Sequence, residues 1–162
     1  MKRFFSLLLT TLLLLLPLQL AADDDCSSGP ESHWAGVAAS SHASGKPIMV
    51  VFSSDACGYC SRLKSELIRP MLDDGALQQQ VVIREFNIDR LENIEDFDGL
   101  PVRSRTFVSR YKIFATPTVI LLDASGKPIG NPIVGYDNSE DYRNRLRGMI
   151  EEAQRTLALA AL

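Results

Sequence analysis

Residues that bind metal ions through sulfur or nitrogen are scarce in this chain of 162 residues, which contains 3 cysteines and 2 histidines. A structural zinc site needs four such ligands, usually in two closely spaced pairs. Only Cys57 and Cys60 form a close pair, because Cys26, His33 and His42 lie apart in an unpatterned stretch. The sequence therefore argues against a zinc protein, and its core must form without a framework of structural disulfides.

An excess of positive charge is also lacking. The formal net charge is −3, and loss of Lys2 and Arg3 with the N-terminal segment leaves 15 basic against 20 acidic residues, a net charge of −5. Nucleic acids and anionic membrane surfaces are bound through clustered lysines and arginines. We therefore expect neither as a partner.

Long apolar runs are missing except at the N-terminus. Two basic residues precede an apolar stretch over residues 4–16, which ends at Pro17 and is followed by two alanines. This pattern is typical of a secretory signal peptide, although an uncleaved anchor is the alternative. We predict a signal peptide over 1–22, an acidic flexible tail over 23–32 and one folded domain over 33–162. Export would place that domain in the bacterial periplasm, which is kept oxidising.

The motif that carries chemistry is C-x-x-C at residues 57–60. It follows an apolar, β-branched run over 48–52 and precedes a helical pattern that begins at Ser61. A strand that leads into two thiols at the start of a helix is typical of a redox motif. Unpaired N–H groups at the helix N-terminus stabilise a thiolate there.

Apolar periodicity and turn residues predict the rest of the chain. The expected elements are a weak helix over 30–43, a strand over 48–52, a helix over 57–77 kinked or divided by Pro70, a strand over 81–88, a loop or insertion over 91–105, a short helix over 106–114, a strand over 118–122, an edge strand over 128–134 and a last helix capped by Asn138 or Ser139. Crossover helices require the first two strands to be parallel, and the short turn over 123–127 requires the last two to be antiparallel. We therefore predict an α/β fold with a central mixed sheet of about four strands and helices on both faces.

This arrangement resembles the thioredoxin fold over residues 30–159. Thr116-Pro117, directly before the third strand of the sheet, resembles the cis-proline segment of that family, which implies that Pro117 is cis and that Thr116 contacts substrate. Gly135 resembles a family glycine beside the same groove. The resemblance thus implies a thiol–disulfide oxidoreductase that needs no cofactor and no metal.

The residues between the cysteines refine the resemblance. Gly58 and Tyr59, with Thr116 before the proline, resemble the bacterial disulfide isomerases of the DsbC kind. The separate dimerisation domain of those isomerases is missing, and the insertion over 91–105 is more similar to the single-domain periplasmic thioredoxins of the SoxW type. The missing domain argues against isomerase activity. We also expect a monomer.

We expect Cys57 to attack substrate and the more buried Cys60 to resolve the mixed disulfide. Substrate binding is assigned to a set of residues around the pair: Gly58, Tyr59, Thr116, Pro117 and Gly135.

A departure from the family pattern concerns an acid beneath the motif. Thioredoxins place a buried Asp on the strand before C-x-x-C, where this chain has Val51, and a Lys on the next strand, where it has Glu85. We expect Glu85 to lie beneath the motif without a cation and to accept the proton of Cys60. The alternative is a solvated surface carboxylate.

The expected function is reduction of disulfides in periplasmic proteins, with electrons supplied by a membrane donor. One alternative is an isomerase or oxidase of the DsbC kind. Another is a non-enzymatic carrier that binds copper through Cys57 and Cys60.

Overall fold

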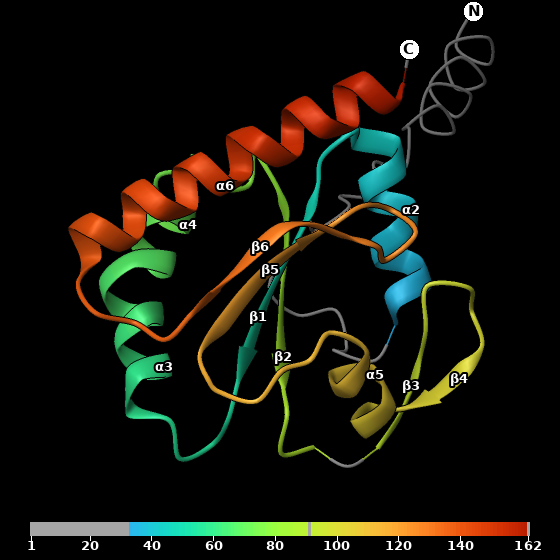
Figure 1. Ribbon diagram of the computed structural model, residues 1–162, viewed down its shortest axis with the longest axis horizontal. Helices are drawn as coiled ribbons and strands as arrows, with labels where there is room; N and C mark the ends of the chain where they lie inside the picture. The colour runs from blue at the N-terminus through green and yellow to red at the C-terminus, as the bar shows by residue number, and fades with distance from the viewer. Residues whose placement is uncertain (1–32, 91, 162) are drawn as a thin grey trace, which may run out of the picture.

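The computed structural model describes residues 33–90 and 92–161 (Figure 1). The predicted signal peptide, the acidic tail and Cys26 lie outside this part of the chain. The elements are α2 (Trp34–Ser44), β1 (Ile48–Ser53), α3 (Gly58–Leu63), the π-helical stretch η2 (Lys64–Ile68), α4 (Arg69–Asp73), β2 (Val82–Asn87), β3 (Asn93–Glu95), β4 (Pro101–Arg103), α5 (Ser104–Arg110), β5 (Thr118–Leu122), β6 (Pro128–Val134) and α6 (Ser139–Ala160). Within the two described stretches, no helix combines the length and apolarity needed to cross a membrane.

The central sheet has the strand order β2-β1-β5-β6, which confirms the predicted α/β fold with four strands. β1 and β2 are parallel, whereas β5 is antiparallel to both β1 and β6. All six residues of β1 are buried, because helices cover both faces of the sheet. β6 carries Pro128 and Pro132 and lies at an edge, where a proline breaks no ladder.

Each face of the sheet has its own apolar core. One core packs α6 and the α3–α4 segment against the sheet, and the other packs α2 and α5 against the opposite face (Figure 1). The second core is aromatic. Its rings have centroids 4.7 to 6.5 Å apart and belong to Trp34, Phe52, Phe86, Phe97, Phe107 and Tyr111.

The helix that follows the cysteines changes its winding before Pro70. The N–H of Arg69 donates to the carbonyl of Lys64, so this turn is π-helical over Lys64–Ile68. Proline has no N–H and crowds the preceding turn, and a wider turn in front of it accommodates both effects. The sequence predicted that Pro70 would kink or divide this helix, and the observed change is the π-helical turn in front of Pro70. The predicted end at residue 77 was wrong, because the helix stops at Asp73 and Gly75 follows with a φ of +74°.

The predicted loop or insertion over 91–105 contains regular structure in its described part, residues 92–105. It contains a small antiparallel sheet of β3 and β4, where a loop was expected, and α5 begins at Ser104 rather than at 106. Phe97 packs against Trp34 with ring centroids 5.3 Å apart and the ring planes tilted by 42°. It also lies over the β5–β6 turn, where a Cβ on Gly126 would come within 2.5 Å of the ring. A short hairpin with few apolar residues gives little periodicity, so these long-range contacts decide its structure.

An ion pair between an exposed arginine and a buried carboxylate ties this insertion to α5. Arg110 donates through Nη1 to Asp96 Oδ1 at 2.8 Å and through Nη2 to Oδ2, and the Phe97 N–H also donates to Oδ1. Asp96 is 8% exposed. The Arg110 guanidinium holds the pKa of this carboxyl below its ordinary value.

We expect Asp96→Asn to lower the free energy of unfolding by about 1–3 kcal/mol, because the charge-assisted hydrogen bonds are lost and Arg110 is left without its counter-ion. Urea unfolding at pH 7 measures this loss. Glu92→Gln, an exposed change in the same insertion, serves as the control and should stay within about 0.5 kcal/mol.

The same pair sets a pH dependence. Because the folded-state pKa of Asp96 is lowered, its contribution is fully present above the unfolded pKa of about 4 and is lost as the pH falls through the folded pKa. The stability difference between wild type and Asp96→Asn should therefore shrink between pH 5 and pH 2. A difference that stays constant over this range would contradict the assignment.

Candidate active site

The sheet topology brings three separate segments together at one end of the strands. Because β1 and β5 are antiparallel, the end of β1 lies beside the start of β5, with Phe52 opposite Thr118. Thr118 also pairs with Val134 at the end of β6. Three segments therefore meet at this end of the sheet: the one before the C-x-x-C motif, the one before β5 and the one after β6.

Hydrogen bonds join these segments. The hydroxyls of Ser54 and Thr116 lie 3.0 Å apart and share a hydrogen bond. The N–H of Gly135 donates to the carbonyl of Pro117 at 2.8 Å, and Gly135 has a φ of +80°, a conformation that favours glycine. The peptide bond between Thr116 and Pro117 is cis.

The two cysteines form a disulfide and differ in burial. Cys57 is half-buried at the N-cap of α3, whereas Cys60 is 2% exposed. The N–H of Cys60 donates to Cys57 Sγ at 3.0 Å. When the pair is reduced, this N–H and the helix N-terminus favour the thiolate of Cys57 over its thiol.

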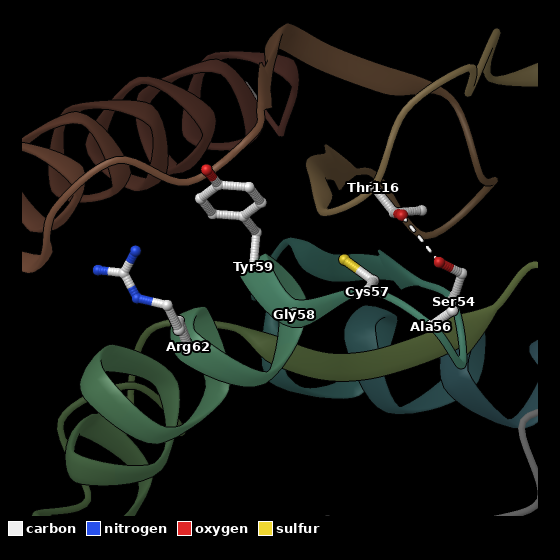
Figure 2. A pocket seen from close by; sticks show the side chains of 7 residues that line it. All are labelled: Ser54, Ala56, Cys57, Gly58, Tyr59, Arg62 and Thr116. Atoms are coloured by element: carbon white, nitrogen blue, oxygen red, sulfur yellow. Dashed lines mark hydrogen bonds between the residues drawn. The ribbon is translucent and has the colours of Figure 1, made fainter.

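An open pocket of about 700 Å³ lies over Cys57 (Figure 2). Its described lining consists of Ser54, Ala56, Cys57, Gly58, Tyr59, Arg62 and Thr116. Four residues of this lining were assigned from the sequence, whereas Ser54, Ala56 and Arg62 were missed. Pro117 and Gly135 are not part of this described lining, and Pro117 is buried.

Ser54 and Arg62 lie just outside the C-x-x-C motif. A search of positions next to the motif could have found both, but no periodic pattern singles them out.

Glu85 has partners that the sequence did not indicate. It pairs with Val51 across β1 and β2, so it lies directly beside the position where the family acid is missing. Glu85 Oε1 accepts hydrogen bonds from Lys64 Nζ at 2.8 Å and from Ser53 Oγ at 2.5 Å. The expectation that Glu85 lacks a cation was therefore wrong, and its role as a proton acceptor for Cys60 stays a prediction.

Arg62 joins the pocket to the loop after β6. Its Nε and Nη2 donate to Glu66 one turn further along the helix, and its guanidinium lies 6.0 Å from the Tyr59 ring and 5.4 Å from the Tyr136 ring. The Tyr136 hydroxyl donates to Glu66 Oε2 at 2.7 Å. These hydrogen bonds lower the pKa of Glu66, and burial together with Glu66 raises the pKa of Tyr136 to about 12. In the described part of the chain, no cluster of three or more His, Cys, Asp or Glu residues has a metal-binding arrangement.

Comparison with known proteins adds to this geometry, because residues 37–150 match the family described as the thioredoxin-like domain. The protein belongs to the thioredoxin-like family. With one half-buried and one buried cysteine in C-x-x-C spacing, this thioredoxin-like protein is a thiol–disulfide oxidoreductase.

Relatives in sequence and structure are distant. Over 112 residues, 69% of this chain, the thioredoxin-like protein is 24% identical to the thiol:disulfide interchange protein DsbD of Ralstonia nicotianae, but it spans only 17% of that protein. The oxidised C-terminal domain of Neisseria meningitidis DsbD superposes with a TM-score of 0.52 at 14% identity, covering 70% of this chain and 90% of that domain. A Thermus thermophilus thioredoxin gives 0.52 at 21% identity, with 72% and 83% covered. At these identities the solved structures support the fold alone.

We expect Cys57→Ser to abolish dithiol turnover, because the accessible nucleophile is gone. Cys60→Ser should instead accumulate mixed disulfides, because attack survives while the resolving thiol is missing. Non-reducing electrophoresis of each variant after reaction with a disulfide protein measures both outcomes. Trapping by Cys57→Ser rather than by Cys60→Ser would reverse the assignment of nucleophile.

We expect Thr116→Val to slow reaction with a peptide disulfide by about two- to tenfold, because valine keeps the shape but cannot form the hydrogen bond to Ser54. Stopped-flow measurement with the reduced protein gives this rate, and Ser54→Ala removes the same bond from the other side. Thr116 faces the pocket, so its substitution should change peptide preference as well as rate. An unchanged rate and preference in Thr116→Val would contradict this role.

Proposed function

We propose that this protein is exported and reduces disulfides in periplasmic proteins, with Cys57 as nucleophile and Cys60 as resolving thiol. The observation that carries the proposal is the unequal environment of the two sulfurs. Cys57 Sγ opens to the pocket and accepts the Cys60 N–H, whereas Cys60 is buried. A pair of this kind can attack one substrate at a time and release it by an internal reaction.

The reaction is a transfer of two electrons through two exchanges. The Cys57 thiolate attacks one sulfur of the substrate disulfide, that S–S bond breaks, and the other substrate sulfur leaves as a thiolate. Cys60 then loses its proton and attacks Cys57 Sγ, which releases the second substrate thiolate and forms the Cys57–Cys60 disulfide. The substrate gains two electrons, and a dithiol donor at the membrane must return two electrons to this protein before the next cycle.

The substrate segment is expected to lie in the pocket in extended form. The backbone around Thr116 and Pro117 would pair with it, as in other cases where a peptide adds a strand to an exposed edge. Gly58 and Tyr59 line the pocket next to Cys57, and the Gly135 N–H donates to the Pro117 carbonyl. These assignments need neither a metal nor an organic cofactor.

Two observations support the cellular setting. The apolar N-terminal segment has the pattern of an export signal. The DsbD relative is named a thiol:disulfide interchange protein, which agrees with a role in exchange between protein partners. We infer a monomer that receives electrons from a membrane protein and passes them to exported proteins.

We expect the Cys57–Cys60 pair to have a reduction potential below about −220 mV, closer to the value of about −270 mV for thioredoxin than to that of strongly oxidising dithiol proteins near −120 mV. Equilibration of the mature protein with glutathione or dithiothreitol buffers measures this value. The reduced protein should also catalyse insulin reduction. A potential near −120 mV would assign the protein to oxidation instead.

The same preparation separates the enzyme from a metal carrier. The reduced protein should bind copper(I) more weakly than copper carriers do. The same protein should catalyse insulin reduction at a measurable rate. Tight copper binding without insulin turnover would contradict the proposed function.

A further inference from the structure

The pocket over Cys57 has one charged residue in its described lining, Arg62. The other side chains there are apolar, hydroxyl-bearing or sulfur-bearing. Figure 2 shows Cys57 between Thr116 and Tyr59, with Arg62 on the side of Tyr59. A substrate segment that passes over Cys57 would thus meet Thr116 at one end of the pocket and a guanidinium at the other.

Arg62 is held in position before any substrate arrives. Its Nε and Nη2 bind Glu66, and its guanidinium packs near the rings of Tyr59 and Tyr136. Tyr136 is 6% exposed and its ring lies 5.3 Å from that of Tyr142. Tyr136 therefore anchors the side chains of Arg62 and Glu66 to the core. An ordered arginine loses less side-chain freedom on binding than a free one.

The contact with Glu66 leaves part of the guanidinium free to bind another group. It is a side-on contact through Nε and Nη2, so the Nη1 amino group lies outside it. Glu66 lies one helical turn further from the disulfide and is not part of the pocket lining. The charge that a substrate meets inside the pocket is therefore that of Arg62.

We propose that Arg62 determines substrate specificity by binding a carboxylate next to the reacting cysteine, so that the protein prefers disulfide segments with Glu or Asp at that position. This inference rests on the proposed function and names the class of peptide that the pocket accepts. Arg62 touches the substrate and leaves the sulfur exchange itself to Cys57 and Cys60.

Three cyclic disulfide peptides test the proposal. They are identical except that Glu, Gln or Lys stands beside both cysteines. The fully reduced protein is mixed with each peptide in excess at 0.1 M salt, and acid-quenched samples give the single-turnover rate. No electron donor is required, so the readout depends on substrate reaction alone.

We expect the Glu peptide to react about three- to tenfold faster than the Lys peptide, with the Gln peptide between them. Arg62→Gln should reduce the ratio of Glu to Lys rates to below about twofold, and Arg62→Glu should invert it. At 1 M NaCl the wild-type ratio should approach one, because the Debye length falls to about 3 Å.

Arg69→Glu is the matched control. Arg69 is an exposed arginine on the same helical segment, outside the pocket lining, and the substitution changes the net charge as Arg62→Glu does. Arg69→Glu should keep the wild-type ratio. Loss of the ratio in Arg69→Glu would assign the effect to overall charge and overturn the proposal.

The remaining outcomes separate the two proposals. Equal reduction of all three peptides by wild type, or the same ratio in wild type and Arg62→Gln, would overturn the selectivity and leave the reductase function standing. If wild type reduces none of the peptides, the proposed function fails and the selectivity fails with it.

Discussion

The active site depends on the burial of β1 at the centre of the sheet. Its six residues are covered on both faces, so its register against β2 and β5 is fixed by two separate apolar cores. β1 runs directly into the turn that carries Cys57, and its antiparallel neighbour β5 starts beside that turn. Because a strand has a side-chain period of two, a slip of one residue would exchange the faces of β1 and separate Ser54 from Thr116.

The difference between the two cysteines follows from their places on one helix. Cys57 is the N-cap, so its sulfur lies at the helix N-terminus and accepts the Cys60 N–H, which also donates to the Cys57 carbonyl. Cys60 lies in the first turn of α3 and is buried. A spacing of two residues thus gives one accessible and one buried sulfur, and the backbone N–H of Cys60 supplies a donor to Cys57 Sγ without a charged side chain.

The helices and strands of the main fold could be predicted from the sequence because local residue patterns determine them. The unbroken apolar run of β1, the prolines of the edge strand β6 and the cap Asn138, which accepts the Asp141 N–H, all predict their elements without long-range information. Cys57, the proposed nucleophile, and Thr116 also lie in motifs. The partners of Glu85 could not be read, because Lys64 and Ser53 reach it from two other elements. The sheet of β3 and β4 was missed for a related reason, since Phe97 and Asp96 are held by Trp34 and Arg110 from distant parts of the chain.

The two apolar cores position residues at opposite ends of the same pocket. The core beneath α3 and α6 includes Tyr136, which donates to Glu66, and Glu66 in turn holds Arg62 at the pocket. The aromatic core on the other face fixes α5, whose last turn leads into the segment that ends at Thr116. Tyr111 closes that core by donating its hydroxyl to the carbonyl of Gly126, and burial raises the pKa of this hydroxyl to about 12. The insertion packs on the same aromatic core and so supports the segment that carries Thr116. The position of Arg62 depends instead on the helix that carries the cysteines. Changes in the insertion should therefore act on how the substrate backbone is held, and changes along the cysteine helix on which side chains the pocket accepts.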